Sequence, residues 1–210
     1  MFKTKTKKMM LTLAIAAVLA IGGTLAALSV VGPAKDNEIT FLSATAGVDA
    51  ALEENTWNAA NALNLTPGKS VAKDPTIVNK GQLPIYTAIK VKFTNGNNVE
   101  LSQADFEKLM TIITIKSAGT NTYSTDWKAP VTPTPVMNFY CKAELAKGMK
   151  STPLFDNILI NESATQADLV WLKNMNGFKI VVVGAGVQGG DAIANVATAE
   201  PELKTLLETA

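Results

Sequence analysis

The chain has 210 residues, and its 19 basic and 18 acidic side chains leave a net charge of +1. This balance excludes a strongly basic protein that binds nucleic acid by neutralising phosphates. Every basic residue is Lys, and the sequence has no Arg and no His, which excludes guanidinium clamps, Ser-His-Asp catalysis and His-ligated zinc. Because 47% of the residues are hydrophobic, we expect a folded chain with a substantial core.

The N-terminal 26 residues have the three parts of a secretory signal peptide. Lysines crowd positions 3–8, an apolar run covers 9–21, and small residues surround Ala26. The run of about 13 residues is shorter than the ~20 that a bilayer-spanning helix needs. We therefore predict a signal-peptide helix over residues 1–26, cleaved between Ala26 and Ala27, with membrane contact only before cleavage. The alternative is an uncleaved membrane anchor.

After cleavage, we expect an N-terminal arm over residues 27–37 and one domain over residues 38–210. The arm is short and is broken by Gly32 and Pro33, so we do not expect it to pack within the domain. Within the domain, alternating or continuous apolar residues predict strands over residues 38–42, 45–52, 71–78, 85–93, 111–115, 122–127, 137–143, 154–160 and 178–183.

Turn signals separate these strands, at Pro67-Gly68 and at residues 79–81, 95–98 and 147–148. Proline presets one backbone angle of a turn, and glycine supplies the left-handed conformation. About nine short strands with turns every ~8–12 residues predict an all-β sandwich with a few short peripheral helices.

Three helices are expected around the sandwich. Ser102 caps the first, over residues 102–110, and Asp105 stands at the third position after it, as in a capping box. Its buried stripe is predicted to consist of Phe106, Leu109, Met110 and Ile113. The second helix is expected over 165–175 and the third over 201–209, with Pro201 in its first turn.

Few side chains suggest a chemical site. Cys141 is the single cysteine, so an internal disulfide is excluded, and its apolar neighbours predict a buried thiol, with a reactive thiol as the alternative. We interpret the acid pairs Glu53-Glu54 and Asp105/Glu107 as exposed acids on a turn and on a helix. A carboxylate pair of the glycosidase kind stays open. The three tryptophans are expected in the core.

Residues 184–189 match the glycine pattern GxGxxG of dinucleotide-binding proteins. That fingerprint requires a second strand and an acidic residue about 20 positions later. Only 20 residues follow Gly190, and they contain no strand pattern. We therefore predict a strand that runs into a tight turn before the last helix, and we expect no cofactor and no metal.

Four segments together resemble a known family. They are residues 22–26 (GGTLA), 65–81 (LTPGKSVAKDPTIVNKG), 139–155 (FYCKAELAKGMKSTPLF) and 180–188 (IVVVGAGVQ). In order and spacing they are similar to the TasA/camelysin-type exported proteins of Gram-positive bacteria, whose signal peptides are removed by a SipW-type signal peptidase. The family's aromatic residue after GGTxA is absent, and Ala185-Gly186 stands where Glu-Ala is common.

The resemblance implies a jelly-roll sandwich and a secreted protein of the extracellular matrix or cell surface. Fibre-forming relatives assemble by donor-strand exchange, in which one subunit's N-terminal segment completes the sheet of the next. Here the arm and the start of the domain would supply Leu28, Val30, Val31 and Ile39 as the apolar side chains that fill the groove. Such head-to-tail addition does not close and gives filaments.

On this resemblance we expect a structural protein, not an enzyme, that polymerises with itself and with a related minor fibre subunit. A monomeric cell-surface binding or adhesion module on the same fold is the first alternative. A camelysin-like protease is the second, although the chain has neither His nor an HExxH motif to hold zinc.

Overall fold

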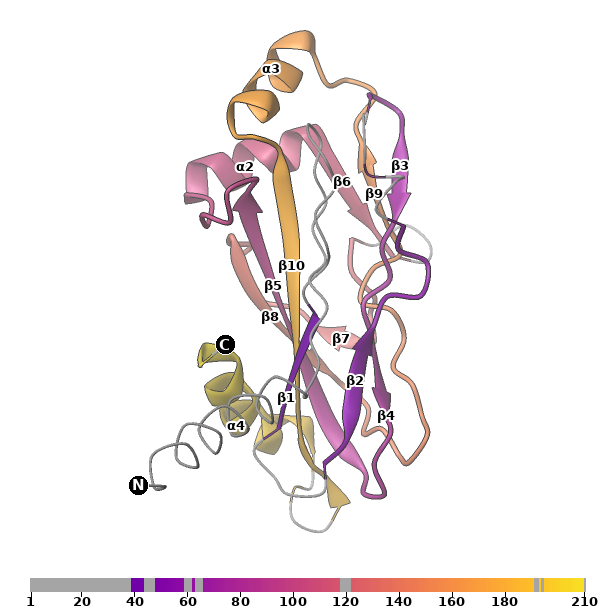
Figure 1. Cartoon of the computed structure of the whole chain (residues 1–210). Helices are drawn as coiled ribbons and strands as arrows, with labels where there is room; N and C mark the ends of the chain where they lie inside the picture. The colour runs from indigo at the N-terminus through magenta and orange to yellow at the C-terminus, as the bar shows by residue number, and fades with distance from the viewer. Residues whose placement is uncertain are drawn as a thin grey trace, which may run out of the picture.

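The computed structural model describes residues 39–43, 48–58, 62, 66–117, 122–190, 193 and 195–209. The predicted signal peptide, residues 1–26, and the predicted arm, residues 27–37, lie outside these ranges. Within them the chain forms ten strands in three sheets, together with three helices. The expectation of a mostly β protein is therefore confirmed (Figure 1).

The largest sheet has five strands in the order β1-β10-β5-β8-β7. Its longest members are β5 and β10, which pair antiparallel over their whole length and are both rich in the β-branched and aromatic residues that favour strands. β8 and β7 continue the sheet antiparallel, whereas β1 joins the other edge in parallel. The bounds are β1 Ile39–Ser43, β5 Ile85–Asn95, β7 Trp127–Lys128, β8 Val136–Cys141 and β10 Phe178–Gln188.

Two smaller sheets complete the fold, one of β2 and β4 and one in the order β3-β9-β6. All their pairs are antiparallel. Their bounds are β2 Ala50–Glu53, β3 Ser70–Ala72, β4 Thr76–Asn79, β6 Ile113–Lys116 and β9 Asn157–Ile160. The predicted strand over 71–78 is thus two strands in two different sheets, because Pro75 interrupts the hydrogen-bond ladder between them.

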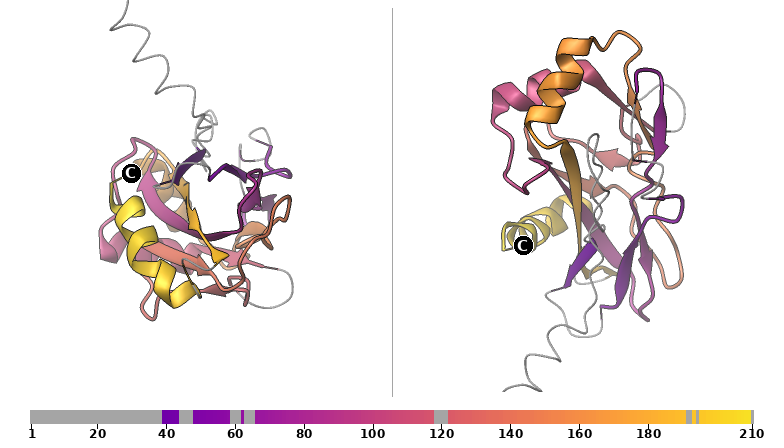
Figure 2. Two further views of the ribbon diagram at one scale, coloured as in Figure 1. Left: turned by 90° about the horizontal axis from the view of Figure 1, so that it is seen from below. Right: turned by 45° about the horizontal axis from the view of Figure 1, so that its top comes forward.

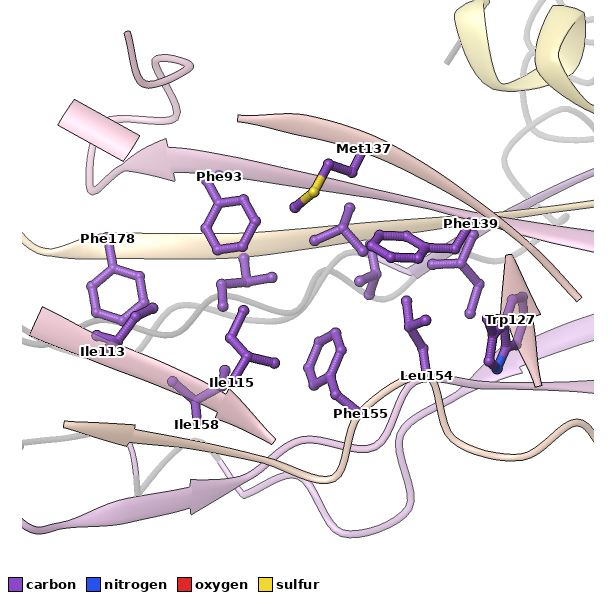
Figure 3. Packing of buried hydrophobic residues seen from close by; sticks show 14 of the residues in the cluster. Phe93, Ile113, Ile115, Trp127, Met137, Phe139, Leu154, Phe155, Ile158 and Phe178 are labelled. Carbon is purple, nitrogen blue, oxygen red and sulfur yellow. The ribbon is translucent and has the colours of Figure 1, made fainter. Parts of the chain in front are cut away.

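One core cluster is built by side chains from all three sheets. Figure 3 shows Phe93, Met137 and Phe139 of the large sheet lying across from Ile115 and Ile158 of the three-stranded sheet. Phe93, Phe139 and Ile158 are at most 1% exposed. Burial of this apolar surface, at about 25 cal/mol per Å², is the main force that holds the sheets together.

The first two helices lie together at one end of the sheets (Figure 2). They are α2, Gln103–Ile112, and α3, Gln166–Asn174. Ser102 caps α2 by accepting a hydrogen bond from the Asp105 N–H at 3.1 Å, as predicted. The Lys108 ammonium lies 4.8 Å from the centre of the Trp171 ring and so links the two helices.

The third helix, α4, spans Val196–Glu208 and begins earlier than predicted. Asn195 is its N-cap and accepts a hydrogen bond from the Thr198 N–H at 3.1 Å. Pro201 therefore lies inside the helix rather than in its first turn, which corrects the prediction. The cap supplied by Asn195 fixes the start of the helix, and at this interior position the proline removes one backbone N–H and crowds the carbonyl of Ala197.

Other boundaries also differ from the predictions. Residues 122–126 are not a strand, and only Trp127–Lys128 pair with β8. The predicted strand over 154–160 begins at Asn157, and β10 extends five residues beyond residue 183. The predicted turn at Asn79 is confirmed: its side chain donates to the carbonyls of Leu83 and Leu145 and accepts from the Gly81 N–H. Among the residues described, no helix is long and apolar enough to cross a membrane.

The glycine-rich segment forms the C-terminal half of β10, so the predicted strand end at residue 183 is wrong and the strand continues to Gln188. Gly184 and Gly186 are hydrogen-bonded strand residues paired with β5. By strand alternation they share a face with Ile180 and Val182 of the main core. A dinucleotide fingerprint needs these glycines in the turn between strand and helix, and this geometry is absent from the segment.

Candidate functional site

The predicted site residues divide into two groups. Ala26, Ala27, Leu28, Val30 and Val31, which carry the predictions of cleavage and of the assembly arm, lie outside the described residues. Ile39 is described, and it is the first residue of β1. The structure thus places only the start of the predicted domain, and no part of the arm over residues 27–37, beside β10 in the large sheet.

β1 lies beside β10 in parallel, with Ile39 opposite Val182 and Ser43 opposite Gly186. Every other strand pair among the described residues is antiparallel. A parallel pair cannot be joined by a hairpin. β1 and β10 are accordingly far apart in the sequence, and most of the chain lies between them. The attachment of β1 to the sheet is by main-chain hydrogen bonds to β10.

The two faces of β10 are covered by different structures. Phe178 and Val182 belong to the main core, whereas Ala185 and Val187 belong to a second cluster beneath α4. Figure 2 shows α4 lying against the outside of the large sheet. β5 occupies one edge of β10, both faces of β10 are covered, and β1 lies along the remaining edge.

A second candidate site was missed by the sequence analysis. Glu54 was expected to be an exposed acid, but its side chain is only 1% exposed and its Oε1 lies 2.6 Å from the Nζ of Lys73. The Lys73 side chain is fully buried. The Lys73 ammonium also lies 5.0 Å from the centre of the Trp57 ring. The prediction for Glu54 is therefore wrong, because Lys73 offsets the cost of burying the carboxylate.

Burial moves both members of this pair toward their neutral forms. Loss of solvent lowers the pKa of Lys73, and its attraction to the Glu54 carboxylate opposes this effect only in part. Loss of solvent likewise raises the pKa of Glu54, and the negative charge of Asp74 raises it further. Asp74 is held by the Thr56 N–H, which donates to its Oδ1 at 2.9 Å.

A signal for this pair exists in the sequence. In a strand, residues two apart share a face, so Glu54 continues the face of the buried Leu52, and Lys73 continues that of the buried Val71. Each of the two inward-facing sets of side chains therefore ends in a charged residue, an acid in one and a base in the other. What the sequence does not reveal is that these two sets come from different sheets and meet at one point.

No metal-binding group is formed by the part of the chain that the structure describes, since no three Cys, Asp or Glu side chains gather there. Cys141 is 2% exposed, as predicted, and burial raises the pKa of its thiol. Trp127 is buried, and Trp57 and Trp171 pack against the main core.

Comparisons with known proteins identify no family. No family model matches the sequence, and no curated protein matches it. Among solved structures, a chain in a crystal structure of a dockerin–cohesin complex at pH 5.5 is similar over 60% of this chain and 92% of its own length, at 9% identity and a TM-score of 0.28. So distant a similarity carries no argument about function.

Proposed function

We propose that this chain is a secreted structural protein, a subunit of extracellular fibres of a biofilm matrix or cell surface, without enzymatic activity. In this proposal a SipW-type signal peptidase cleaves between Ala26 and Ala27, and the freed arm adds as a strand to the next subunit. The finer fold that goes with the proposal is a jelly-roll sandwich. The observation that carries it is the parallel pairing of β1 with the edge of β10.

The physical argument rests on what holds β1 in place. A sheet edge can form main-chain hydrogen bonds with any strand of suitable register. The affinity of the edge for the strand therefore does not depend on which copy of the chain supplies it. Two of the β10 residues opposite β1, Gly184 and Gly186, have no β-carbon, and glycine in a strand permits close approach of a neighbouring segment.

The arm precedes β1 directly in the sequence. The arm of a neighbouring subunit and the subunit's own β1 are therefore candidates for the same edge of β10. A subunit that gives its strand to the next and receives one from the previous makes a head-to-tail contact, which grows without closing. The partners expected under this proposal are further copies of this chain and a related minor fibre subunit.

A disulfide between β1 and β10 tests the exchange. Thr40 and Val183 are direct partners across the strand pair, which places their Cα atoms within disulfide range. We expect the oxidised T40C/V183C protein to stay monomeric because its own β1 is locked in place, and to form filaments after reduction. The two single variants are the controls, and both should polymerise under oxidising conditions.

The measurement is negative-stain electron microscopy of residues 27–210, with a chain lacking residues 27–37 in parallel. We expect filaments from the first and folded monomers from the second. Filaments that survive either the deletion or the disulfide would refute strand exchange. Monomers under all conditions, including reduction, would favour the monomeric binding module.

A further inference from the structure

The pair formed by Glu54 and Lys73 differs from every other ion pair that the structure describes. In the other four pairs the side chains are 22–62% exposed, and the charged atoms are 2.7–3.6 Å apart. Here the exposed fractions are 1% and 0%, and the two atoms are 2.6 Å apart. A close acid–amine contact without access to water is the arrangement required for condensation to an amide.

We propose that Glu54 and Lys73 become joined by an intramolecular isopeptide bond between the Cδ of Glu54 and the Nζ of Lys73. The site is defined by the 2.6 Å contact, by the complete burial of both side chains and by the Trp57 ring, whose centre lies 5.0 Å from Nζ. Nothing in the fibre proposal requires this bond, and either proposal can fail without the other.

The reaction is a condensation that needs no oxidant or reductant. The lone pair of the neutral Lys73 amine attacks the carboxyl carbon of Glu54, and the new C–N bond forms. The bond from that carbon to the acid's hydroxyl oxygen then breaks, and the hydroxyl leaves as water with one proton from the amine. Burial favours the reactive forms, because it lowers the pKa of Lys73 and raises that of Glu54.

Proton transfer during the reaction requires a third group, and we assign this role to Asp74. Its Oδ1 accepts a hydrogen bond from the Thr56 N–H at 2.9 Å, so it is held against the segment that follows Glu54. Its charge acts on both Glu54 and Lys73. In this proposal the Asp74 carboxylate takes the proton from the attacking amine and returns it to the leaving hydroxyl.

Two physical effects make the bond form and persist. Holding the reacting atoms in contact corresponds to an effective concentration of about 10⁵–10⁸ M in well-oriented systems. Exclusion of water, which is both the product and the agent of hydrolysis, then protects the amide. The bond would connect the end of β2 in the two-stranded sheet to the end of β3 in the three-stranded sheet.

Mass spectrometry of the denatured full chain tests the proposal. We expect the mass to be lower, by one water molecule, than that of the same chain without the bond. Trypsin should then release residues 36–69 joined to residues 70–80, because the modified Lys73 is no longer cleaved. Recovery of the separate peptides 70–73 and 74–80, with the full mass, would overturn the proposal.

Matched variants separate this bond from other modifications. The double variant E54L/K73M removes both groups and keeps the site apolar, so it should show the full mass. K80M removes the neighbouring exposed pair, in which Lys80 lies 3.0 Å from Glu53. The mass of this variant should still be lower by one water molecule than its sequence requires. If the mass of E54L/K73M were also lower by one water molecule, the assignment of the bond to Glu54 and Lys73 would be overturned.

The role of Asp74 is tested by D74N, whose amide oxygen still accepts the Thr56 N–H. The fraction of cross-linked chain is followed with time after cell-free synthesis. We expect bond formation to slow by at least about a hundredfold, which is the usual effect of losing a general acid–base group. An unchanged rate in D74N would remove Asp74 from the reaction.

Discussion

The backbone carbonyl oxygen of Asn176 lies 1.9 Å from the position that a β-carbon on Gly96 would occupy. The turn after β5 and the turn before β10 are packed together at this point, since the Gly96 N–H donates to the carbonyls of Met175 and Gly177. A side chain at residue 96 would therefore push apart the ends of the two longest strands in the sheet.

We predict that G96A lowers the free energy of unfolding by about 2–3 kcal/mol, as expected when an atom is forced into a packed site. The control is G148A, at a residue with φ of +73° and no atom within 4 Å of the added β-carbon. There only the left-handed backbone opposes the substitution, at a cost of about 1 kcal/mol. Chemical denaturation of both variants measures the difference, and equal effects would contradict the steric explanation.

The buried pair predicts a non-additive mutational cycle. K73M leaves the Glu54 carboxyl without its amine, and E54L leaves the Lys73 amine without its carboxyl, in a site without solvent. Relative to the chain in which the pair has not formed the amide, each single variant should lose about 3–5 kcal/mol of stability, whereas E54L/K73M should be more stable than either single variant. A double variant as unstable as the sum of the two losses would show that the groups act independently.

Tyr123 predicts a loss of stability in alkali. Its ring centre lies 4.5 Å from that of Phe139 and 6.3 Å from that of Phe155, and burial raises the pKa of its phenol well above the ordinary value of 10.0. The unfolded chain releases this proton near pH 10 and the folded chain retains it. The stabilisation is therefore complete below pH 10 and is lost as the pH rises above it.

The measurement is the free energy of unfolding on both sides of pH 10, with Y123F as the control. We expect the free energy of the unmodified protein to fall more steeply with pH than that of Y123F. Parallel curves would show that Tyr123 titrates alike in the folded and unfolded chains.

The packing of α4 predicts different costs at two leucines in the same helix. Leu203 is fully buried in the cluster between α4 and the large sheet, whereas Leu206 only borders this cluster. L203A should lower the free energy of unfolding by about 2–5 kcal/mol, as for a buried leucine, and L206A should cost clearly less. Similar losses would mean that the contact of α4 with the sheet is not centred on Leu203.

The sequence predicts most strands and the two capped helices because these depend on local patterns. β5 shows its alternation within the segment 85–93, and the cap of α2 at Ser102 is a local signal. Of the predicted buried stripe, Phe106 and Leu109 are confirmed, whereas Met110 is half-buried and Ile113 begins β6; the third buried residue of the helix is Ile112. The start of α4 was missed because Pro201 is the stronger local signal, although Asn195 supplies the cap.

The sites were harder to predict because they depend on contacts between distant residues. Period-two alternation marks Glu54 and Lys73 as inward-facing, but only the fold brings the ends of β2 and β3 together. The parallel neighbour of Ile39 is Val182, and no local pattern specifies a partner so far along the chain. The place of Gly184 and Gly186 inside β10 was not predicted, because it depends on pairing with β5.

The pairing of Ile39 with Val182 spans 182 − 39 = 143 residues, and this separation has a consequence in time. At a synthesis rate of ~5–20 residues per second, β10 appears about 7–30 s after β1. Contacts closed over so long a loop also form late, because the entropy of the intervening chain opposes them. For that interval β1 has no β10 edge to join within its own chain. Under the strand-exchange proposal, it is then open to pairing with the β10 of a complete copy.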